Sequence, residues 1–338
     1  MNIGIVNDLP LAAEALRRAI ALKPEHNVIW VARDGAEAVR MCAKQTPDVV
    51  LMDMIMPGMS GVEATRQIMA NTPCAILIVT VSVGANATGV FEAMGHGALD
   101  AIDTPSFGTG DPRKSAAPLL SKIDSIGKLI DHKNGKLNVF ATETSTLPAL
   151  EAYPLIAIGS SAGGPGALAK VLSSLPKDLA AAIVIVQHVD AEFAVGMASW
   201  LNKTSRLPVR VAREGDRPEL GSVLLAGTSD HLTLTTGGRL AYVPEPSDYA
   251  YRPSVDVFFH SVCRLWKHKA IGVLLTGMGR DGALGLKALR DKGWHTIAQD
   301  QASSAVYGMP KAAAALNAAV DILPLERIAP KLISILDS

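Results

Sequence analysis

Residues 155–165 read LIAIGSSAGGP, and this stretch decides the fold of the second half of the chain. Its first five residues are apolar or glycine, as in a strand that is buried on both faces of a parallel sheet. A helix is expected after Pro165, because leucine and valine then recur on one helical face. Gly159–Gly163 therefore fits the G-x-S-x-G pattern in a strand-turn-helix context, and Ser161 occupies its central position.

The pattern predicts a serine nucleophile at the carboxyl end of this strand. Glycines permit a sharp turn that lifts Ser161 above the sheet, and the start of the helix offers unpaired N–H groups to an oxyanion. One alternative is a serine that only caps the helix. Another is a dinucleotide-binding loop, because residues 164–169 imitate G-x-G-x-x-A and Asp190 follows the next strand. That motif begins directly after its strand, however, and Ser160–Gly164 intervene here.

Two further strand ends supply the partners that a serine nucleophile needs. The predicted strand 182–187 ends in His188, and imidazole titrates near neutral pH, as a general base should. The predicted strand 270–276 leads into a glycine-flanked segment that contains Asp281, whose carboxylate would orient the imidazole. Taken singly, each residue has a structural alternative: a surface or core histidine, and an aspartate that caps a helix. Together they predict a Ser-His-Asp triad.

The length and composition indicate two α/β domains. The chain has 338 residues, more than the roughly 250–300 at which one hydrophobic core stops growing. Hydrophobic residues make up 49% and aromatic residues 4%, so the cores consist of small aliphatic side chains. In the first half, β-branched runs alternate with helical patterns, which predicts a doubly wound parallel sheet. The runs are Ile3–Val6, Val28–Val31, Val49–Met52, Ile76–Val79 and Leu99–Ile102, followed by a helix over Pro118–Ile130.

The second half is expected to form a mostly parallel sheet between helices, with one hairpin. Gly237 and Gly238 separate two short runs at hairpin spacing, inside an otherwise parallel sheet. The predicted strands after Leu155–Gly159 are Ala182–Gln187, Val209–Arg213, Val223–Ala226, His231–Thr235, Leu240–Val243, Ala270–Thr276 and His295–Ala298. Polar residues and prolines mark a linker between the halves. We therefore predict domains at 1–131 and 154–338 and a linker at 132–153.

An acidic pocket is predicted in the first domain. Asp8, Asp53 and Thr80 each follow a predicted strand, so they should meet at the carboxyl edge of the sheet. Carboxylates gathered there would bind Mg²⁺, which prefers one or two carboxylates plus phosphate and water oxygens. Asp53 would then accept a phosphoryl group. An acidic residue at a strand end is more commonly a helix cap, but three ordered positions favour the phosphoryl site.

Residues 1–125 resemble the response-regulator receiver family, through these positions and the turn MDMIMPG at 52–58. The resemblance implies a flavodoxin-like fold, with Asp53 as phosphorylation site, Thr80 as the hydroxyl that senses phosphate, and Asp8, Asp53 and the Ile55 carbonyl as metal ligands. The chain departs from the family pattern twice. The acidic pair after the first strand is Asn7-Asp8, and Thr104 replaces the lysine that usually precedes the proline after strand five and pairs with phosphate.

From Leu155 onward the chain resembles the chemotaxis-type protein-glutamate methylesterases of the CheB family. The motifs GSSAGGP, VIVQH, YRPSVDVFF and LLTGMGRDG carry the resemblance. More narrowly, NDLPLAAEALRRA and FEAMGHGALDAIDTP are similar to the WspF-like subgroup of Wsp-type surface-sensing pathways. The oxyanion would be held by the N–H of Ala162, the residue after the nucleophile, and, by the resemblance, by that of Met278.

The resemblance implies a phosphorylation-controlled esterase. It would hydrolyse glutamate methyl esters and deamidate glutamines on methyl-accepting receptors, with a chemotaxis-type histidine kinase as phosphoryl donor. Mg²⁺ would serve the receiver and no cofactor the esterase. Tyr251 and Arg252 would line the substrate cleft, although a structural loop explains them nearly as well. The alternatives are a non-enzymatic, phosphorylation-dependent adaptor and a hydrolase of small-molecule esters.

Other classes are disfavoured by the sequence. Lys+Arg and Asp+Glu are equal at 32 each, which supplies no electrostatic footprint for nucleic acid. The three cysteines lack metal-ligand spacing, HExxH is absent, and His260 with Cys263 is too sparse for zinc. No signal peptide or membrane-spanning stretch is recognisable, so a cytoplasmic location without membrane insertion is expected.

Overall fold

The computed structural model describes residues 1–83, 86–105, 111–131, 153–247, 249 and 251–337. The chain divides into two compact units, Met1–Gly135 and Lys136–Ser338. The predicted linker lies outside the described residues except for Tyr153.

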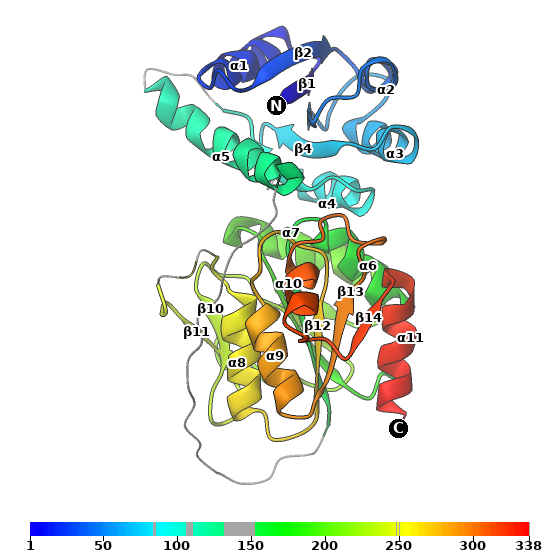
Figure 1. Cartoon of the computed structure of the whole chain (residues 1–338), viewed down its shortest axis with the longest axis vertical. Coiled ribbons are helices and arrows are strands. Elements are labelled where there is room, and N and C mark those ends of the chain that lie inside the picture. The colour runs from blue at the N-terminus through cyan, green and yellow to red at the C-terminus, as the bar shows by residue number, and fades with distance from the viewer. Residues whose placement is uncertain (84–85, 106–110, 132–152, 248, 250, 338) are drawn as a thin grey trace. The chain divides into compact units, whose positions relative to one another are not determined.

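The first unit is an α/β domain with one five-stranded sheet in the order β2-β1-β3-β4-β5 (Figure 1). Every pairing in it is parallel, so the predicted doubly wound sheet is confirmed. The strands are β1 Asn2–Val6, β2 Asn27–Ala32, β3 Val49–Met52, β4 Ala75–Thr80 and β5 Asp100–Asp103. The helices are α1 Pro10–Ala21, α2 Gly35–Lys44, α3 Gly61–Asn71, α4 Ala87–Gly95 and α5 Pro112–Asp131.

The core of this unit explains one boundary that the sequence placed wrongly. Alternate residues of β1, β3 and β4 pack against α1 and α5, because successive side chains of a strand point to opposite faces. Helix α5 begins at Pro112 and contains Pro118, at which the sequence placed its start. An interior proline weakens a helix, but Ala116, Leu119 and Ile123 on either side of it are buried in the core. Their burial favours continuing the helix through the proline.

The second unit contains a seven-stranded sheet in the order β14-β13-β12-β6-β7-β9-β8, and all of its pairings are parallel. Its strands are β6 Leu155–Ser160, β7 Ala182–Gln187, β8 Val209–Val211, β9 Val223–Leu225, β12 Ala270–Leu274, β13 His295–Gln299 and β14 Asp321–Leu323. The helices are α6 Gly164–Ser174, α7 Ala191–Thr204, α8 Val255–Leu265, α9 Ala283–Asp291, α10 Met309–Ala315 and α11 Leu325–Leu336.

The predicted hairpin is present, but it forms a sheet of its own. β10 His231–Leu234 pairs antiparallel with β11 Leu240–Val243, and neither strand joins the large sheet. Gly238 takes a φ of 69° in the connecting turn, a conformation that favours glycine. The hairpin packs on α8, where the N–H of Leu234 donates to Ser261 Oγ at 3.0 Å. This contact ties the hairpin to the helix that begins beside the candidate site.

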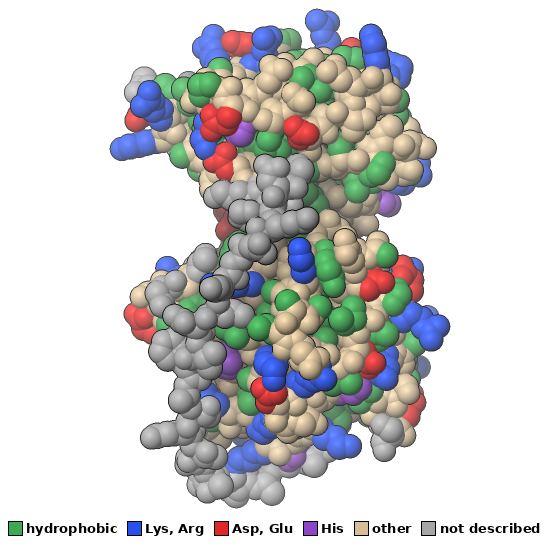
Figure 2. Space-filling model, in the orientation of Figure 1, with side chains coloured by type: hydrophobic (Ala, Val, Ile, Leu, Met, Phe, Trp, Pro, Cys, Tyr) green, Lys and Arg blue, Asp and Glu red, His purple; other side chains and the backbone are tan. Residues whose placement is uncertain are grey.

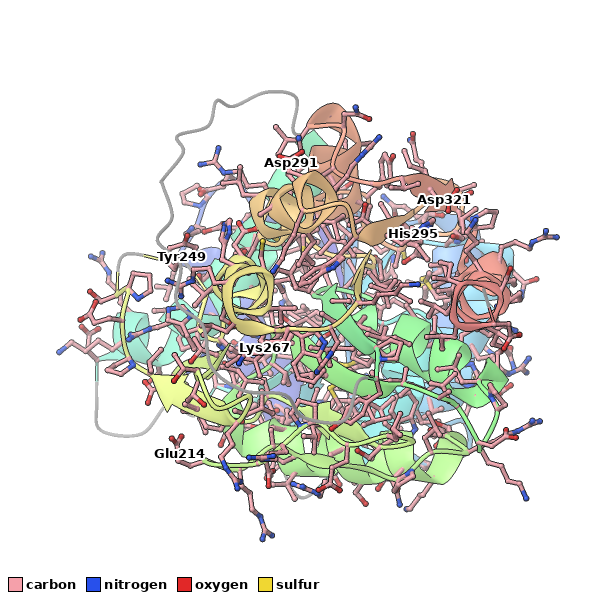
Figure 3. The ribbon with its side chains drawn as sticks, turned by 90° about the horizontal axis from the view of Figure 1, so that it is seen from below. Glu214, Tyr249, Lys267, Asp291, His295 and Asp321 are labelled. Carbon is pink, nitrogen blue, oxygen red and sulfur yellow. The ribbon has the colours of Figure 1, made fainter. Side chains whose placement is uncertain are left out.

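Strand β14 was not predicted from the sequence. It is a three-residue strand at the edge of the sheet, too short to show a periodic pattern. Asp321 contacts His295 Nε2 at 2.7 Å and Lys331 Nζ at 3.1 Å, so ionic contacts from β13 and α11 hold the strand in place. Figure 3 shows His295 and Asp321 beside each other at the periphery of the unit.

The second unit has three layers. The strand order of its central sheet brings the ends of three strands together. One side of the sheet packs on α8, α9 and α10 through a core that includes Phe258, Phe259 and Leu286. Helices α6, α7 and α11 pack together as a second group (Figure 1). Strand β6 lies between β12 and β7, in parallel and in continuous register with both. The residues that follow these three strands are therefore neighbours at one edge of the sheet.

The surface shows no strong segregation of charge on the face that Figure 2 presents, where basic and acidic side chains are interspersed. Within the described residues, no helix combines the length and the apolar character needed to cross a bilayer.

Replacing Gly159 by alanine tests the close approach of β6 and α8. A Cβ at Gly159 would lie 2.2 Å from Val255 Cγ1, so the variant must displace the side chain of Val255 in the first turn of α8. We expect a loss of about 1–3 kcal/mol in the free energy of unfolding, the usual cost of overpacking. Gly237→Ala is the control, because the nearest atom to its Cβ would be Thr235 Oγ1 at 3.8 Å. Denaturant unfolding of both variants checks this, and equal midpoints would contradict it.

Candidate active site

Ser161 is the first residue after β6, and its backbone is fastened to both neighbouring strands. Its N–H donates to the carbonyl of Thr276 after β12, at 3.0 Å. Its carbonyl accepts from Gln187 Nε2 at the end of β7, at 2.9 Å. The Ser161 residue is 8% exposed. The turn that presents this side chain is thus held on both sides by backbone and amide hydrogen bonds.

Glycines make this turn possible. Gly163 precedes α6 with a φ of 74°, in the left-handed region that other residues avoid. A Cβ at Gly164 would lie 2.0 Å from Gln187 Oε1, and one at Gly277 would lie 2.8 Å from the Ser161 Cβ. The glycines of the GSSAGGP and LLTGMG motifs therefore let three strand ends approach closely around Ser161.

The two adjacent serines differ in their surroundings. Ser160 is fully buried as the last residue of β6, and its Oγ donates to Gln187 Oε1 at 2.6 Å. Its hydroxyl is thus committed to the hydrogen-bond network that holds the turn. Ser161 Oγ makes no hydrogen bond within the part of the chain that the structure describes, so it is the hydroxyl left for chemistry.

His188 and Asp281 lie in direct contact, although 93 residues separate them. His188 Nε2 is 2.7 Å from Asp281 Oδ2, and the His188 N–H donates to the carbonyl of Ser160 at 3.1 Å. Both side chains are buried. The structure therefore brings together two members of the predicted triad at the end of the strand that carries the third.

The surroundings of Asp281 keep its carboxylate ionised. Oδ1 accepts from Ser254 Oγ at 2.7 Å and from the N–H of Asp256 at 3.0 Å, and Oδ2 also accepts from the N–H of Val255 at 2.7 Å. Burial opposes ionisation, but His188, the Asp256 N–H and Ser254 outweigh it, and the pKa of Asp281 is lowered. The N-terminus of α8 favours an anion at this position as well.

An ionised Asp281 decides the tautomer of His188. A carboxylate only accepts hydrogen bonds, so Nε2 of His188 carries the hydrogen in the 2.7 Å contact with Asp281. Nδ1 then holds the lone pair, and this buried atom has no hydrogen-bond partner among the described residues. His188 Nδ1 is therefore the atom that can take a proton. No hydrogen bond joins it to Ser161 Oγ in the described structure; in unliganded enzymes such contacts commonly tighten only when substrate binds.

Tyr251 contributes in a way that the sequence did not reveal. Its ring stacks on the imidazole of His188, with centroids 4.2 Å apart and planes at 9°. Stacking fixes the plane of the imidazole, and the π face of the tyrosine favours a positive charge on it.

Arg252, the other residue predicted to line the cleft, is exposed. Ser254 and Gln187 are site residues that the sequence analysis did not predict, although a serine before an apolar run is typical of a helix N-cap and Gln187 directly precedes His188.

The two predicted oxyanion donors are available. Neither the N–H of Ala162 nor that of Met278 donates a hydrogen bond within the described residues. The carbonyl of Ala162 accepts from Thr276 Oγ1 at 3.0 Å, and the N–H of Gly277 donates to Val306 at 3.0 Å. These bonds hold the two peptide segments in place beside Ser161.

The predicted phosphoryl site in the first unit is assembled around Asp53. This residue follows β3 and is 8% exposed. Its Oδ1 accepts from the N–H of Met54 at 2.7 Å, and its Oδ2 accepts from Asn7 Nδ2 at 3.1 Å. Burial raises the pKa of Asp53, the N–H groups of Met54 and Ile55 oppose that shift, and the charge of Asp8 adds to it. Asp8 and Asp53 therefore repel one another, a donor set that a divalent cation would stabilise.

The other predicted receiver residues lie at the same edge of the sheet. Thr80 ends β4 and is buried, and its Oγ1 accepts from Asn86 Nδ2 at 3.0 Å. Thr104 donates its N–H to the carbonyl of Thr80 at 2.8 Å, directly after β5. The side chain of Ile55 is exposed, as its predicted role requires only its carbonyl.

A separate group of potential metal ligands lies at the opposite edge of the first unit. Among the described residues, Glu25, His26 and Asp124 place ligand atoms within 4.8 Å of one another. Lys23 already pairs with Asp124, so a cation occupies the position that a metal ion would need. We therefore interpret this group as a cluster of ion pairs.

Replacing Asp281 by asparagine tests its lowered pKa, because that shift makes the free energy of unfolding depend on pH. A carboxylate with a lowered pKa stabilises the folded state above its unfolded pKa of about 3.9, and this contribution disappears as the pH falls through the folded pKa. We expect the free energy of unfolding of the wild type to exceed that of Asp281→Asn by about 1–3 kcal/mol at pH 7, because buried donors lose their ionised acceptor in the variant. The difference should shrink below about pH 4.

Urea unfolding at a series of pH values measures this difference. Asp190→Asn is the matched control, because Asp190 lies close after His188, is exposed, and makes no side-chain capping bond. A wild-type advantage over Asp281→Asn that is constant down to strongly acid pH would contradict the assignment.

Comparisons with known proteins agree with this architecture. Residues 156–332 match the family model described as CheB methylesterase, and residues 3–107 match that of the response regulator receiver domain. A protein-glutamate methylesterase/protein-glutamine glutaminase of Burkholderia thailandensis is 64% identical over 335 residues, which cover 99% of this chain and 97% of the relative. One of Pseudomonas aeruginosa is 58% identical over 337 residues and covers 100% of both chains.

A solved structure supports the second unit. The crystal structure of the Thermotoga maritima CheB methylesterase catalytic domain covers 55% of this chain and 100% of its own, with 35% identity and a TM-score of 0.52. The family that the motifs predicted is thereby confirmed. This chain belongs to the CheB methylesterase family and carries a response-regulator receiver domain in its first half.

Proposed function

We propose that this chain is a protein-glutamate methylesterase and protein-glutamine glutaminase that uses Ser161, His188 and Asp281 as its catalytic triad. One observation carries the proposal: His188 contacts the ionised Asp281 through Nε2, which leaves Nδ1 without a hydrogen-bond partner among the described residues, while the His188 backbone N–H donates to the carbonyl of Ser160 in the serine turn. A nucleophile, a base and an orienting carboxylate are the parts that acyl transfer requires. The names of the relatives support the substrate class.

The reaction proceeds in two acyl-transfer steps. Ser161 Oγ attacks the γ-carbonyl carbon of a glutamyl methyl ester while His188 Nδ1 takes the hydroxyl proton. Collapse of the tetrahedral intermediate breaks the bond to the methoxy oxygen, and Nδ1 returns the proton, so methanol leaves. Water then attacks the acyl-enzyme by the same route and releases the glutamate side chain. With a glutamine substrate the first leaving group is ammonia, which explains why one site serves both activities.

The surrounding groups stabilise the charges that arise. The N–H groups of Ala162 and Met278 would hold the oxyanion, each contributing about 3 kcal/mol to the lowering of the barrier. Asp281 stabilises the imidazolium, and Tyr251 covers one of its faces. Arg252 follows Tyr251 and is exposed, so it would be able to contact acidic residues of a protein substrate.

The first unit serves as the switch of this enzyme. Receiver domains of this kind are phosphorylated with Mg²⁺ by histidine kinases, and we assign phosphorylation to Asp53 and sensing of the phosphoryl group to Thr80. Asp8, Asp53 and the Ile55 carbonyl would hold Mg²⁺, which neutralises charge during transfer. Membrane receptors of the methyl-accepting type are the proposed substrates, and a chemotaxis-type histidine kinase is the proposed donor. The WspF-like subgroup stays a prediction.

The domain boundaries 1–131, 132–153 and 154–338 and a cytoplasmic location are part of the same proposal. The free cysteines Cys42, Cys74 and Cys263 suit a reducing compartment, and the proposed kinase acts in the cytoplasm.

Alanine at Ser161 tests the nucleophile. We expect Ser161→Ala to abolish methanol release from methylated receptor, a loss on the order of 10⁶ in kcat, because the serine and histidine of a triad act as a unit. Ser160→Ala is the matched control: it removes a buried hydrogen bond to Gln187 but no reacting group, and it should retain most of the activity. Turnover by Ser161→Ala, or loss of turnover only in Ser160→Ala, would exclude this mechanism.

Removal of the receiver domain tests whether the unphosphorylated receiver inhibits the esterase. If the unphosphorylated receiver restrains the esterase, a fragment starting near Ala152 should release methanol faster than the full chain. A phosphoryl donor should accelerate the full chain and leave Asp53→Asn unchanged. Equal rates for the fragment and the full chain would remove the case for restraint by the receiver.

A further inference from the structure

The first turns of α8 and α9 meet and exchange carboxylates. Asp281, in the segment before α9, accepts from the N–H groups of Val255 and Asp256 in the first turn of α8. In return Asp256 Oδ1 accepts from the N–H of Gly285 in the first turn of α9, at 2.7 Å. A Cβ at Gly285 would lie 2.5 Å from Phe259 Cβ, so the two helices are as close as glycine allows. Each helix start is therefore completed by an acidic side chain from the other.

The two carboxylates have different chemistry despite this exchange. Asp256 is 5% exposed, and its side chain has no basic partner among the contacts that the structure records. Burial, together with the negative charge of Asp281, raises the pKa of Asp256 to about 7, against the opposing N–H groups of Gly285, Gly282 and Leu284. Asp281 is instead held ionised by His188. The pair therefore combines a carboxylate whose pKa is lowered with one whose charge changes near neutral pH.

Other titratable groups in this region keep their own partners. His231 of β10 accepts from the N–H of Ser254 through Nδ1 and contacts the Pro246 carbonyl through Nε2. His260 lies on α8 itself, where burial and the charge of Arg264 lower its pKa against the effect of Asp281. On α9, Lys287 pairs with Asp291, and Arg290 donates to Asn317. The charge of Asp256 therefore acts mainly on Asp281 and, through it, on His188.

We propose that Asp256 is a positioning residue of the esterase: it ties the start of α8, whose N–H groups hold Asp281, to the start of α9, and it sets the negative charge that His188 meets when it takes the proton from Ser161. The proposal rests on the catalytic roles proposed above. When Asp256 is ionised, a second buried negative charge stabilises the imidazolium and makes Nδ1 more basic. When Asp256 is protonated, only Asp281 supports the imidazolium. The ionisation of Asp256 therefore depends on the charge of Asp281.

Two substitutions separate the anchoring role from the charge. Asp256→Asn keeps the size and one oxygen acceptor for the Gly285 N–H but cannot ionise, whereas Asp256→Ala removes both. In Asp256→Asn the acidic limb of the kcat/KM profile should move to lower pH by about one unit and sharpen to a single ionisation. Its kcat at the optimum should stay within a few-fold of the wild type. Asp256→Ala should lower kcat by about 10–100-fold with KM little changed, since it misplaces Asp281.

The experiment uses the full chain, with methanol release from methylated receptor measured between pH 5 and 9. The matched control is Asp291→Asn, which neutralises an exposed aspartate at the end of α9, labelled in Figure 3, and should leave the pH profile unchanged. A profile of Asp256→Asn that superimposes on the wild type would overturn the proposal, even if Asp256→Ala fails to fold.

A second readout does not depend on turnover. The ring titration of His188 is followed by NMR in chains with labelled histidine, and the signal is assigned by its loss in His188→Gln. We expect Asp256→Asn to lower the titration midpoint of His188 by about one pH unit. An unchanged midpoint would contradict the proposal. If the wild type releases no methanol, the proposed function fails, while this titration still decides the role of Asp256.

Discussion

The carboxylate of Asp281 is the constraint on which the rest of the catalytic unit depends. It accepts hydrogen bonds from His188, from the Ser254 hydroxyl and from two N–H groups at the start of α8. Without an anion here those N–H groups would be buried and unpaired, which costs free energy in any fold. The charge that completes a helix is thus the charge that orients His188, the proposed catalytic base. The same hydrogen bonds therefore complete the start of α8 and hold Asp281 in the candidate active site.

The order of the strands provides the second requirement. Strand β6 lies between β12 and β7, so the serine turn can be fastened on one side by Thr276 and on the other by Gln187. Parallel strands all end at the same edge of a sheet, which brings residues from distant parts of the chain together there. Small residues at the crossing points keep the approach close. The parallel sheet therefore positions the side chains of the candidate active site, and few residues outside the strand ends are needed there.

The receiver pocket differs in charge from what its family usually presents. Asn7 donates to Asp53 where a second acidic residue would repel it, and Asp8 is left as the other carboxylate. Thr104 donates its backbone N–H to the carbonyl of Thr80 and brings no positive side chain to the proposed phosphoryl site. The neutral amide of Asn7 thus reduces the negative charge of the pocket, and Thr104 takes the place of the usual lysine. Both departures were visible in the sequence, but the hydrogen bonds that Asn7 and Thr104 make were visible only in the structure.

Local patterns were sufficient to predict the parts of this protein. Buried strands, the serine turn, and the strand-end positions of Ser161, His188 and Asp281 follow from periodicity and turn chemistry, which act over a few neighbouring residues. The tertiary structure decided which nitrogen of His188 is free, that Tyr251 stacks on it, and that Ser254 and Asp256 join the network. It also separated the hairpin from the large sheet and added the short strand β14. Those features depend on hydrogen bonds and packing between residues far apart in the chain, and only the arrangement of strands and helices in space determines which of them meet.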